Sequence, residues 1–343
     1  MVHKKLRCNI IIYIFLILFV APLGAAKADP ALERYKKAWP RTNFNKKTVD
    51  FSEIISGGPQ KDGIPAIDSP KFIEAKREKT LLNREPIIAV QIENDIRAYP
   101  IRYLMWHEIV NDVVSNRNVT ITFCPLCNSA LVFDGRLNGR VFTFGVSGLL
   151  RNADMIMYDR QTESWWQQFT GEAIAGEMTG TALTVIPTVM ESWNAFKTAH
   201  PDGLVMMQPE GYSRRYGANP YVGYDGSAQP FLYRGEMPPH DIPPLARVVR
   251  VDMFAWPLSR LAEKGKITEN GVTLTWRKGQ ASALDGMVIG QSRHVGDVRV
   301  VDAASGELVA HEVVFAFAFH AFTPDGVWMI GENEPLPQNV EAQ

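Results

Sequence analysis

The sequence predicts an α+β fold that is mostly antiparallel β-sheet with a few short helices. Short runs rich in β-branched and aromatic residues recur between clusters of turn-forming residues, and residues 119–123 are a clear example. Patterns with helical spacing are fewer and shorter. The helices also do not alternate with the strands, which argues against a doubly wound sheet. We see no internal repeat with a convincing fixed period.

The first predicted elements lead toward a pair of cysteines. Residues 86–101 form two alternating runs around a polar turn and predict a hairpin. Residues 103–110 have apolar side chains at helical spacing, and residues 119–123 predict a strand that runs into Cys124. The later elements are strands at residues 129–133, 140–146, 154–159 and 165–169, a helix at residues 191–200, and strands at residues 248–251, 272–276, 299–302 and 312–322.

The chain is expected to divide into four parts. The first begins with a basic head, continues with an apolar run and ends at Ala26-Lys27-Ala28, which is the pattern of a signal peptide. That run is shorter than the ~20 residues that span a bilayer, although an uncleaved anchor is the alternative interpretation. We expect a signal peptide at residues 1–28, an extended N-terminal segment at residues 29–56, a single β-rich domain at residues 57–330 and a polar tail at residues 331–343.

Composition narrows the class of partner. The chain has 343 residues and a formal net charge of −1, so neither nucleic acid nor an anionic membrane is favoured electrostatically. After cleavage of the signal peptide we expect a periplasmic or secreted protein without membrane contact, acting on a small molecule or a protein. Residues 208–244 are rich in Tyr, Gly and Pro and are too long for an ordinary connection, so they predict a lid or an irregular excursion.

Cysteine usage is the most informative count. Of the three cysteines, Cys8 lies in the expected signal peptide, which leaves Cys124 and Cys127 in a Cys-Pro-Leu-Cys sequence. In an oxidising compartment this is a redox pair, half of a metal site or a small structural disulfide. A thioredoxin-like site needs a long helix after the motif, but residues 129–133 predict a strand. A metal knuckle needs a left-handed residue after the second cysteine, and Asn128 tolerates that conformation.

A metal site needs ligands beyond the two cysteines. His107 is the best candidate, because it lies on the short predicted helix before the strand that delivers Cys124. Two thiolates and a neutral imidazole suit Cu(I), whereas zinc needs about two ligands more than the cysteines provide. We therefore expect Cys124, Cys127 and His107 as ligands, with copper preferred over zinc. A histidine that is satisfied by a neighbour on the helix face is the alternative for His107.

Residues 144–168 combine glycines, charged side chains of both signs and two tryptophans. Such a mixture of polar and aromatic groups suits a substrate pocket. If the protein is an enzyme, we expect Arg151, Asp154, Tyr158 and Asp159 to shape that pocket, beside a metal ion that does redox chemistry or activates water. The alternative is structural, since the residues that follow Asp159 form a good turn.

Four blocks of sequence stand out in order along the chain. They are Gly63-Ile64-Pro65-Ala66-Ile67-Asp68, Trp106-His107-Glu108-Ile109-Val110-Asn111-Asp112, Thr122-Phe123-Cys124-Pro125-Leu126-Cys127-Asn128-Ser129-Ala130 and residues 144–168. They resemble the hallmark segments of a bacterial and archaeal family called domain of unknown function 3179, and the resemblance spans residues 57–329. It implies that the Cys-Pro-Leu-Cys and Trp-His-Glu blocks belong together, and it implies no established activity.

Three functions remain open at this stage. The favoured one is an exported metal-binding protein, which would be a metal-dependent redox or hydrolytic enzyme if it is catalytic. The first alternative is a metal-free periplasmic thiol-disulfide oxidoreductase. The second is a non-catalytic binding module whose cysteine pair is a structural staple. Metal analysis separates the first from the other two.

Overall fold

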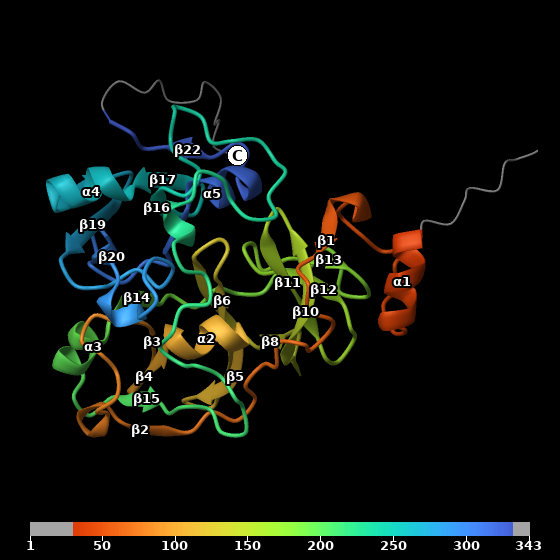
Figure 1. The fold of residues 1–343 in the computed structure, drawn as a ribbon, viewed down its shortest axis with the longest axis horizontal. Helices are drawn as coiled ribbons and strands as arrows, with labels where there is room; N and C mark the ends of the chain where they lie inside the picture. Colours follow the sequence, from red (N-terminus) through yellow and green to blue (C-terminus); the bar gives the residue numbers. More distant parts are fainter. Residues whose placement is uncertain (1–29, 332–343) are drawn as a thin grey trace, which may run out of the picture.

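The computed structural model describes residues 30–331 and confirms the predicted class (Figure 1). Its sheets are mostly antiparallel, and the five α-helices in this part of the chain have seven to nine residues each. None of the helices in residues 30–331 is long and apolar enough to cross a bilayer. The expected signal peptide and nearly all of the expected polar tail lie outside the described residues, so both stay predictions.

Two parts of the chain have the same order of elements, which we call the first and second copies. The first copy contains β3 (Pro86–Ile92), β4 (Asp95–Pro100), α2 (Ile101–His107), β5 (Ile109–Val114), β6 (Arg117–Cys124), β7 (Ser129–Asp134), β14 (Val189–Ser192), α3 (Trp193–Ala199) and β15 (Leu204–Met206). The second copy contains β16 (Arg247–Val251), β17 (Phe254–Pro257), α4 (Leu258–Lys264), β18 (Lys266–Glu269), β19 (Val272–Arg277), β20 (Asp297–Asp302), β21 (Glu312–Phe315), α5 (Ala316–Phe322) and β22 (Val327–Trp328).

The two copies also pair their strands in the same way. The order β14-β3-β4-β15 in the first copy matches β21-β16-β17-β22 in the second, and β5-β6-β7 matches β18-β19-β20. β15 runs parallel to β4, and β22 runs parallel to β17. The chain therefore contains an internal duplication. The sequence shows no fixed period because the first copy has longer hairpins and receives an additional sheet between β7 and β14.

The duplication extends to single residues at the ends of helices. Pro100 precedes α2 with φ −63° and ψ 128°, and Pro257 precedes α4 with φ −55° and ψ 127°. A proline fits this place because its fixed φ and missing N–H suit the step from strand to helix. A Pro-Asp-Gly turn follows α3 at residues 201–203 and recurs near α5 at residues 324–326.

The two copies pack against each other reciprocally. β21 of the second copy lies beside β7 of the first, and β14 of the first lies beside β20 of the second, as Figure 1 shows for β14 and β20. The backbone N–H of Phe315 donates to the carbonyl of Cys127 at 2.9 Å. The backbone N–H of Ser192 donates to the Asp297 carboxylate at 2.7 Å. Each copy therefore completes the other's core.

The additional sheet belongs to the first copy and has the order β1-β10-β11-β12-β13. Within this sheet, the hairpin that joins β10 to β11 lies against the end of β6. Its strands are β1 (Ile54–Ser56), β10 (Phe144–Arg151), β11 (Asp154–Asp159), β12 (Trp165–Gln167) and β13 (Ala173–Ala175). The short strands β2 (Phe72–Glu74), β8 (Arg136–Leu137) and β9 (Arg140–Val141) and the 3₁₀ turns η1 (Phe51–Glu53), η2 (Ala75–Arg77), η3 (Tyr224–Gly226) and η4 (Ile289–Gln291) complete the described elements.

The expectation of an extended segment at residues 29–56 is wrong for residues 30–38. Residues 30–38 form helix α1 (Pro30–Ala38), which lies beside the additional sheet in Figure 1. The physical reason is aromatic burial, because Tyr35 of α1 packs edge-on against the fully buried ring of Trp165, and Trp39, Phe44 and Phe51 surround the same ring. This contact ties the N-terminal segment to the rest of the fold.

The long connection between β15 and β16 is irregular, as the sequence predicted. Its one regular element is η3 (Tyr224–Gly226). The Tyr216 hydroxyl lies 2.7 Å from His107 Nε2, and the Tyr224 hydroxyl donates to the Leu126 carbonyl at 2.9 Å. The connection therefore covers the region where β6 delivers the two cysteines.

Candidate metal centre

Strand β6 and the turn after it position the two thiols. Cys124 is the last residue of β6, Cys127 lies in the turn, and β7 begins at Ser129, which confirms the predicted strand-to-turn arrangement. Asn128 has φ 52°, the left-handed conformation expected of a metal knuckle. Both cysteines are free thiols, with exposed fractions of 1% for Cys124 and 0% for Cys127.

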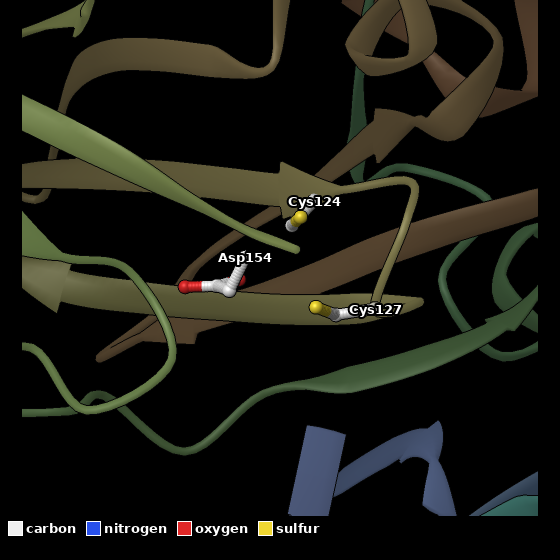
Figure 2. Close-up of side chains that lie close together, drawn as sticks. All are labelled: Cys124, Cys127 and Asp154. Carbon is white, nitrogen blue, oxygen red and sulfur yellow. The ribbon is translucent and has the colours of Figure 1, made fainter. Parts of the chain in front are cut away.

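The hairpin between β10 and β11 brings a carboxylate to the thiols. Asn152 and Ala153 form its turn with φ 50° and 60°, and Asp154 is the first residue of β11. The carbonyl oxygen of Ala153 lies 3.8 Å from Cys124 Sγ and 3.6 Å from Cys127 Sγ. Figure 2 shows the two sulfurs and the Asp154 carboxylate gathered in one place, although they come from different strands and turns.

The geometry offers three ligand atoms for one ion. One oxygen of Asp154 and the two sulfurs all lie within 4.8 Å of one another. Asp154 Oδ2 accepts hydrogen bonds from Gln167 Nε2 at 2.7 Å and from the Phe169 N–H at 2.9 Å. Asp154 Oδ1 is buried and has no hydrogen-bond partner among residues 30–331. Since buried polar atoms are nearly always paired, this oxygen is free to accept a hydrogen bond from a neighbouring thiol or to bind a cation.

Electrostatics point in the same direction. Burial raises the pKa of Asp154 to about 7, against the hydrogen bonds of Gln167 and Phe169 that lower it. Burial also raises the pKa of Cys124, and it raises that of Cys127 well above its ordinary value, helped by the neighbouring thiol and carboxylate. The charges that act on the two thiols and on Asp154 within the described chain come chiefly from other acidic side chains. A cation between them would relieve both desolvation and repulsion.

The structure does not bring His107 into this cluster, which corrects its expected place as third ligand. Its Nδ1 lies 2.7 Å from the Pro65 carbonyl, and its Nε2 lies 2.7 Å from the Tyr216 hydroxyl. α2 ends at His107, and both ring nitrogens of this residue are engaged by the partners just named. The alternative interpretation, a buried histidine satisfied by neighbours, describes His107 in this structure. Asp154 takes the third position instead.

Of the four residues expected to shape a substrate pocket, Asp154 lies in the cluster and the other three have partners elsewhere. Arg151 Nε donates to Glu53 at 2.7 Å, and the Tyr158 hydroxyl donates to Asp62 at 2.5 Å. The Asp159 carboxylate accepts hydrogen bonds from Thr162 and from the Trp166 indole, so it stabilises a turn. A role for these three in substrate binding remains a prediction.

The sequence contained a weak signal for the position of Asp154. A polar Asn-Ala-Asp sequence between two strands is consistent with a two-residue hairpin turn, although alanine is unusual at positive φ. This sequence pattern could not show that the hairpin of β10 and β11 would lie against the turn that carries the thiols. That depends on the packing of the additional sheet against β6 and β7.

A β-rich chain with two buried thiols and a buried carboxylate in one place is a candidate metal-binding protein. The chain belongs to the family described as protein of unknown function DUF3179, which matches residues 61–326. The resemblance inferred from the four sequence blocks is therefore confirmed. No curated protein and no solved structure matches the chain.

Proposed function

We propose that this is an exported metal-binding protein whose metal centre is formed by Cys124, Cys127 and Asp154. The observation that carries the proposal is the group of three buried ligand atoms within 4.8 Å, one of which belongs to a carboxylate with an unpartnered oxygen among the described residues. The ion would join the turn after β6 to the hairpin between β10 and β11. It would thereby attach the additional sheet to the first copy.

Zinc fits this ligand set better than copper. The preference for Cu(I) depended on a neutral imidazole as third ligand, and His107 is engaged elsewhere. Zinc accepts cysteine sulfur and carboxylate oxygen together, whereas Cu(I) selects soft sulfur ligands. A carboxylate as third ligand therefore favours Zn²⁺, and copper becomes the second candidate.

Burial favours a closed centre over a catalytic one. Cys124, Cys127 and Asp154 have exposed fractions of 1%, 0% and 0%, and the connection between β15 and β16 covers the turn that carries the thiols. Catalytic zinc sites keep a coordination position open for water or substrate, whereas structural sites use protein ligands only. We therefore assign the ion a structural role rather than redox or hydrolytic chemistry.

The metal-free thiol oxidoreductase is the rival function. The two free thiols lie close together, which favours it. Attack on a disulfide needs an accessible thiolate, however, and burial raises the pKa of both cysteines. A disulfide staple is the third possibility, and it would leave the Asp154 oxygen without a partner.

Metal analysis of the mature protein tests the proposal. We expect about one equivalent of zinc per chain after purification without chelator, and loss of that zinc in Cys124→Ser and Cys127→Ser. Asp159→Asn is the matched control. It alters a buried carboxylate of β11, the strand that carries Asp154, and this carboxylate lies outside the cluster. A metal-free wild-type protein with reactive thiols would favour the oxidoreductase. A metal-free protein with a disulfide would favour the staple.

Export is tested separately by intact-mass measurement on protein recovered from the periplasm or medium. Cleavage after Ala28 predicts a chain that begins at or near Asp29. A chain that retains the apolar run would mean that the segment is a membrane anchor.

A further inference from the structure

The internal duplication allows the metal centre to be compared with a second copy of the same backbone. Glu108 follows α2 in the first copy, and Gly265 follows α4 in the second. Glu108 has φ 58° and ψ −33°, and Gly265 has φ 68° and ψ −30°. The carbonyl of each accepts a hydrogen bond from the following long strand, from Phe123 N at 2.8 Å and from Trp276 N at 2.9 Å. The two positions are therefore structurally equivalent.

The conformation at this position favours glycine. A residue with a side chain is disfavoured at positive φ, and the penalty is absent for glycine. A Cβ on Gly265 would meet no atom within 4 Å among the described residues, so conformation rather than space accounts for glycine there. The first copy nevertheless carries a glutamate in the same conformation. Glu108 therefore needs an explanation that lies in its side chain.

The side chain of Glu108 lies in an environment that also disfavours it. Glu108 has an exposed fraction of 8%, and its carboxylate has no hydrogen-bond or ion-pair partner among residues 30–331. Its backbone lies beside the cluster, because its carbonyl accepts a hydrogen bond at 2.8 Å from the N–H of Phe123, the residue before Cys124. A positive φ and an acidic residue with little exposure therefore coincide at one position, which indicates a functional role.

We propose that Glu108 is the fourth ligand of the metal centre, an inference that rests on the proposed site of Cys124, Cys127 and Asp154. A closed zinc site needs four protein ligands, and the cluster provides three. The Glu108 carboxylate is not among the three atoms within 4.8 Å, so binding an ion would require this side chain to move toward the cluster. Two thiolates and two carboxylates around Zn²⁺ carry the same net charge as a four-cysteine site.

The second copy explains why the ligand is found only once. The position of Cys124 at the end of β6 corresponds to Arg277 at the end of β19, and no hairpin like that of β10 and β11 faces it within the described chain. Without the thiols and Asp154, a buried carboxylate after α4 would have no ion to bind. Glycine then gives the more stable backbone at residue 265.

The test measures metal affinity and stability together in the mature full chain. Zinc affinity is obtained by competition with a chromophoric chelator, and Co²⁺ is used as a spectroscopic probe of the coordination sphere. We compare Glu108→Gly and Glu108→Gln with the wild type. Glu93→Gly is the matched control, because Glu93 also has positive φ, at 53°, but lies exposed in the hairpin between β3 and β4.

The expected result is a fall in zinc affinity of about tenfold or more in both Glu108 variants, with an altered Co²⁺ spectrum. The metal-free Glu108→Gly protein should unfold at a higher temperature than the metal-free wild type, because glycine suits the backbone and a buried acid is removed. Glu93→Gly should leave zinc affinity unchanged. Unchanged zinc affinity in Glu108→Gly would overturn the proposal and indicate the Ala153 carbonyl or water as fourth ligand. A wild-type protein that binds no zinc would instead overturn the proposed function itself.

Discussion

The contact between the two copies makes stability depend on pH through Glu191. This residue lies on β14, beside Asp297 of β20. Burial, reinforced by the Asp297 charge and opposed by Arg299, raises the pKa of Glu191 from 4.5 to about 7. A carboxyl group with a raised pKa in the folded state binds its proton more tightly there than in the unfolded chain. Its contribution to stability is therefore complete below pH 4.5 and is lost as the pH rises to about 7.

The magnitude follows from the two pKa values. Between about pH 5 and pH 8, the linkage relation gives a loss of about 2.5 kcal/mol in the free energy of unfolding. Since Glu191 is partly exposed, we expect about 2 kcal/mol. Glu191→Gln cannot titrate and should lose this part of the pH dependence, while other groups contribute similarly to both proteins.

Urea unfolding of wild type and Glu191→Gln at both pH values measures the difference directly. The variant should gain about 2 kcal/mol relative to wild type on going from pH 5 to pH 8. Parallel pH dependence in the two proteins would show that Glu191 does not titrate with a raised pKa. It would mean that Glu191 is solvated and that β14 does not pack against β20 as described.

Three further substitutions separate structural residues from metal ligands. His107→Ala should lower the free energy of unfolding by about 1–3 kcal/mol, because two hydrogen bonds are lost. Its zinc affinity should be unchanged, and a large loss of zinc affinity would indicate that His107 is a ligand after all. Asp159→Asn should cost about 1–3 kcal/mol through its bonds to Thr162 and Trp166. Trp165→Ala should cost about 3–5 kcal/mol and make residues 30–53 sensitive to protease, and a resistant N-terminal segment would contradict its docking on that ring.

Local patterns predicted the elements that lead into the centre. The hairpin of β3 and β4, the strand that ends at Cys124 and the left-handed Asn128 are all present. Each depends on residues close together in the sequence: alternation, β-branched side chains and the tolerance of asparagine for positive φ. The cysteine pair was therefore identified with its correct local geometry.

The third ligand depended on contacts that local patterns do not encode. Asp154 meets the thiols because the hairpin of β10 and β11 packs against the end of β6, and this is a contact between different sheets. His107 is the last residue of α2, and its ring nitrogens contact Pro65 and Tyr216 rather than the thiols. Sequence spacing selected His107, which the structure places outside the cluster of Cys124, Cys127 and Asp154.

The C-terminal region shows how tertiary context overrides a local pattern. Residues 312–322 alternate between aromatic and small residues, which predicted one strand, but β21 ends at Phe315 and α5 follows. Every side chain from Ala316 to Phe319 is buried, so alternation carries no information about which face is exposed. The equivalent α3 in the first copy, followed by the same Pro-Asp-Gly turn, is the signal that would have revealed the helix.

X-ray absorption at the zinc edge, measured on mature protein purified without chelator, identifies the ligands of the metal centre directly. We expect about one zinc per chain, with two sulfur ligands near 2.3 Å and oxygen ligands near 2.0–2.2 Å from the carboxylates. Loss of the sulfur contribution in Cys124→Ser should accompany loss of the metal. A native protein that contains no metal, or one whose metal has no sulfur ligands, would contradict the assignment of Cys124, Cys127 and Asp154 as a metal centre.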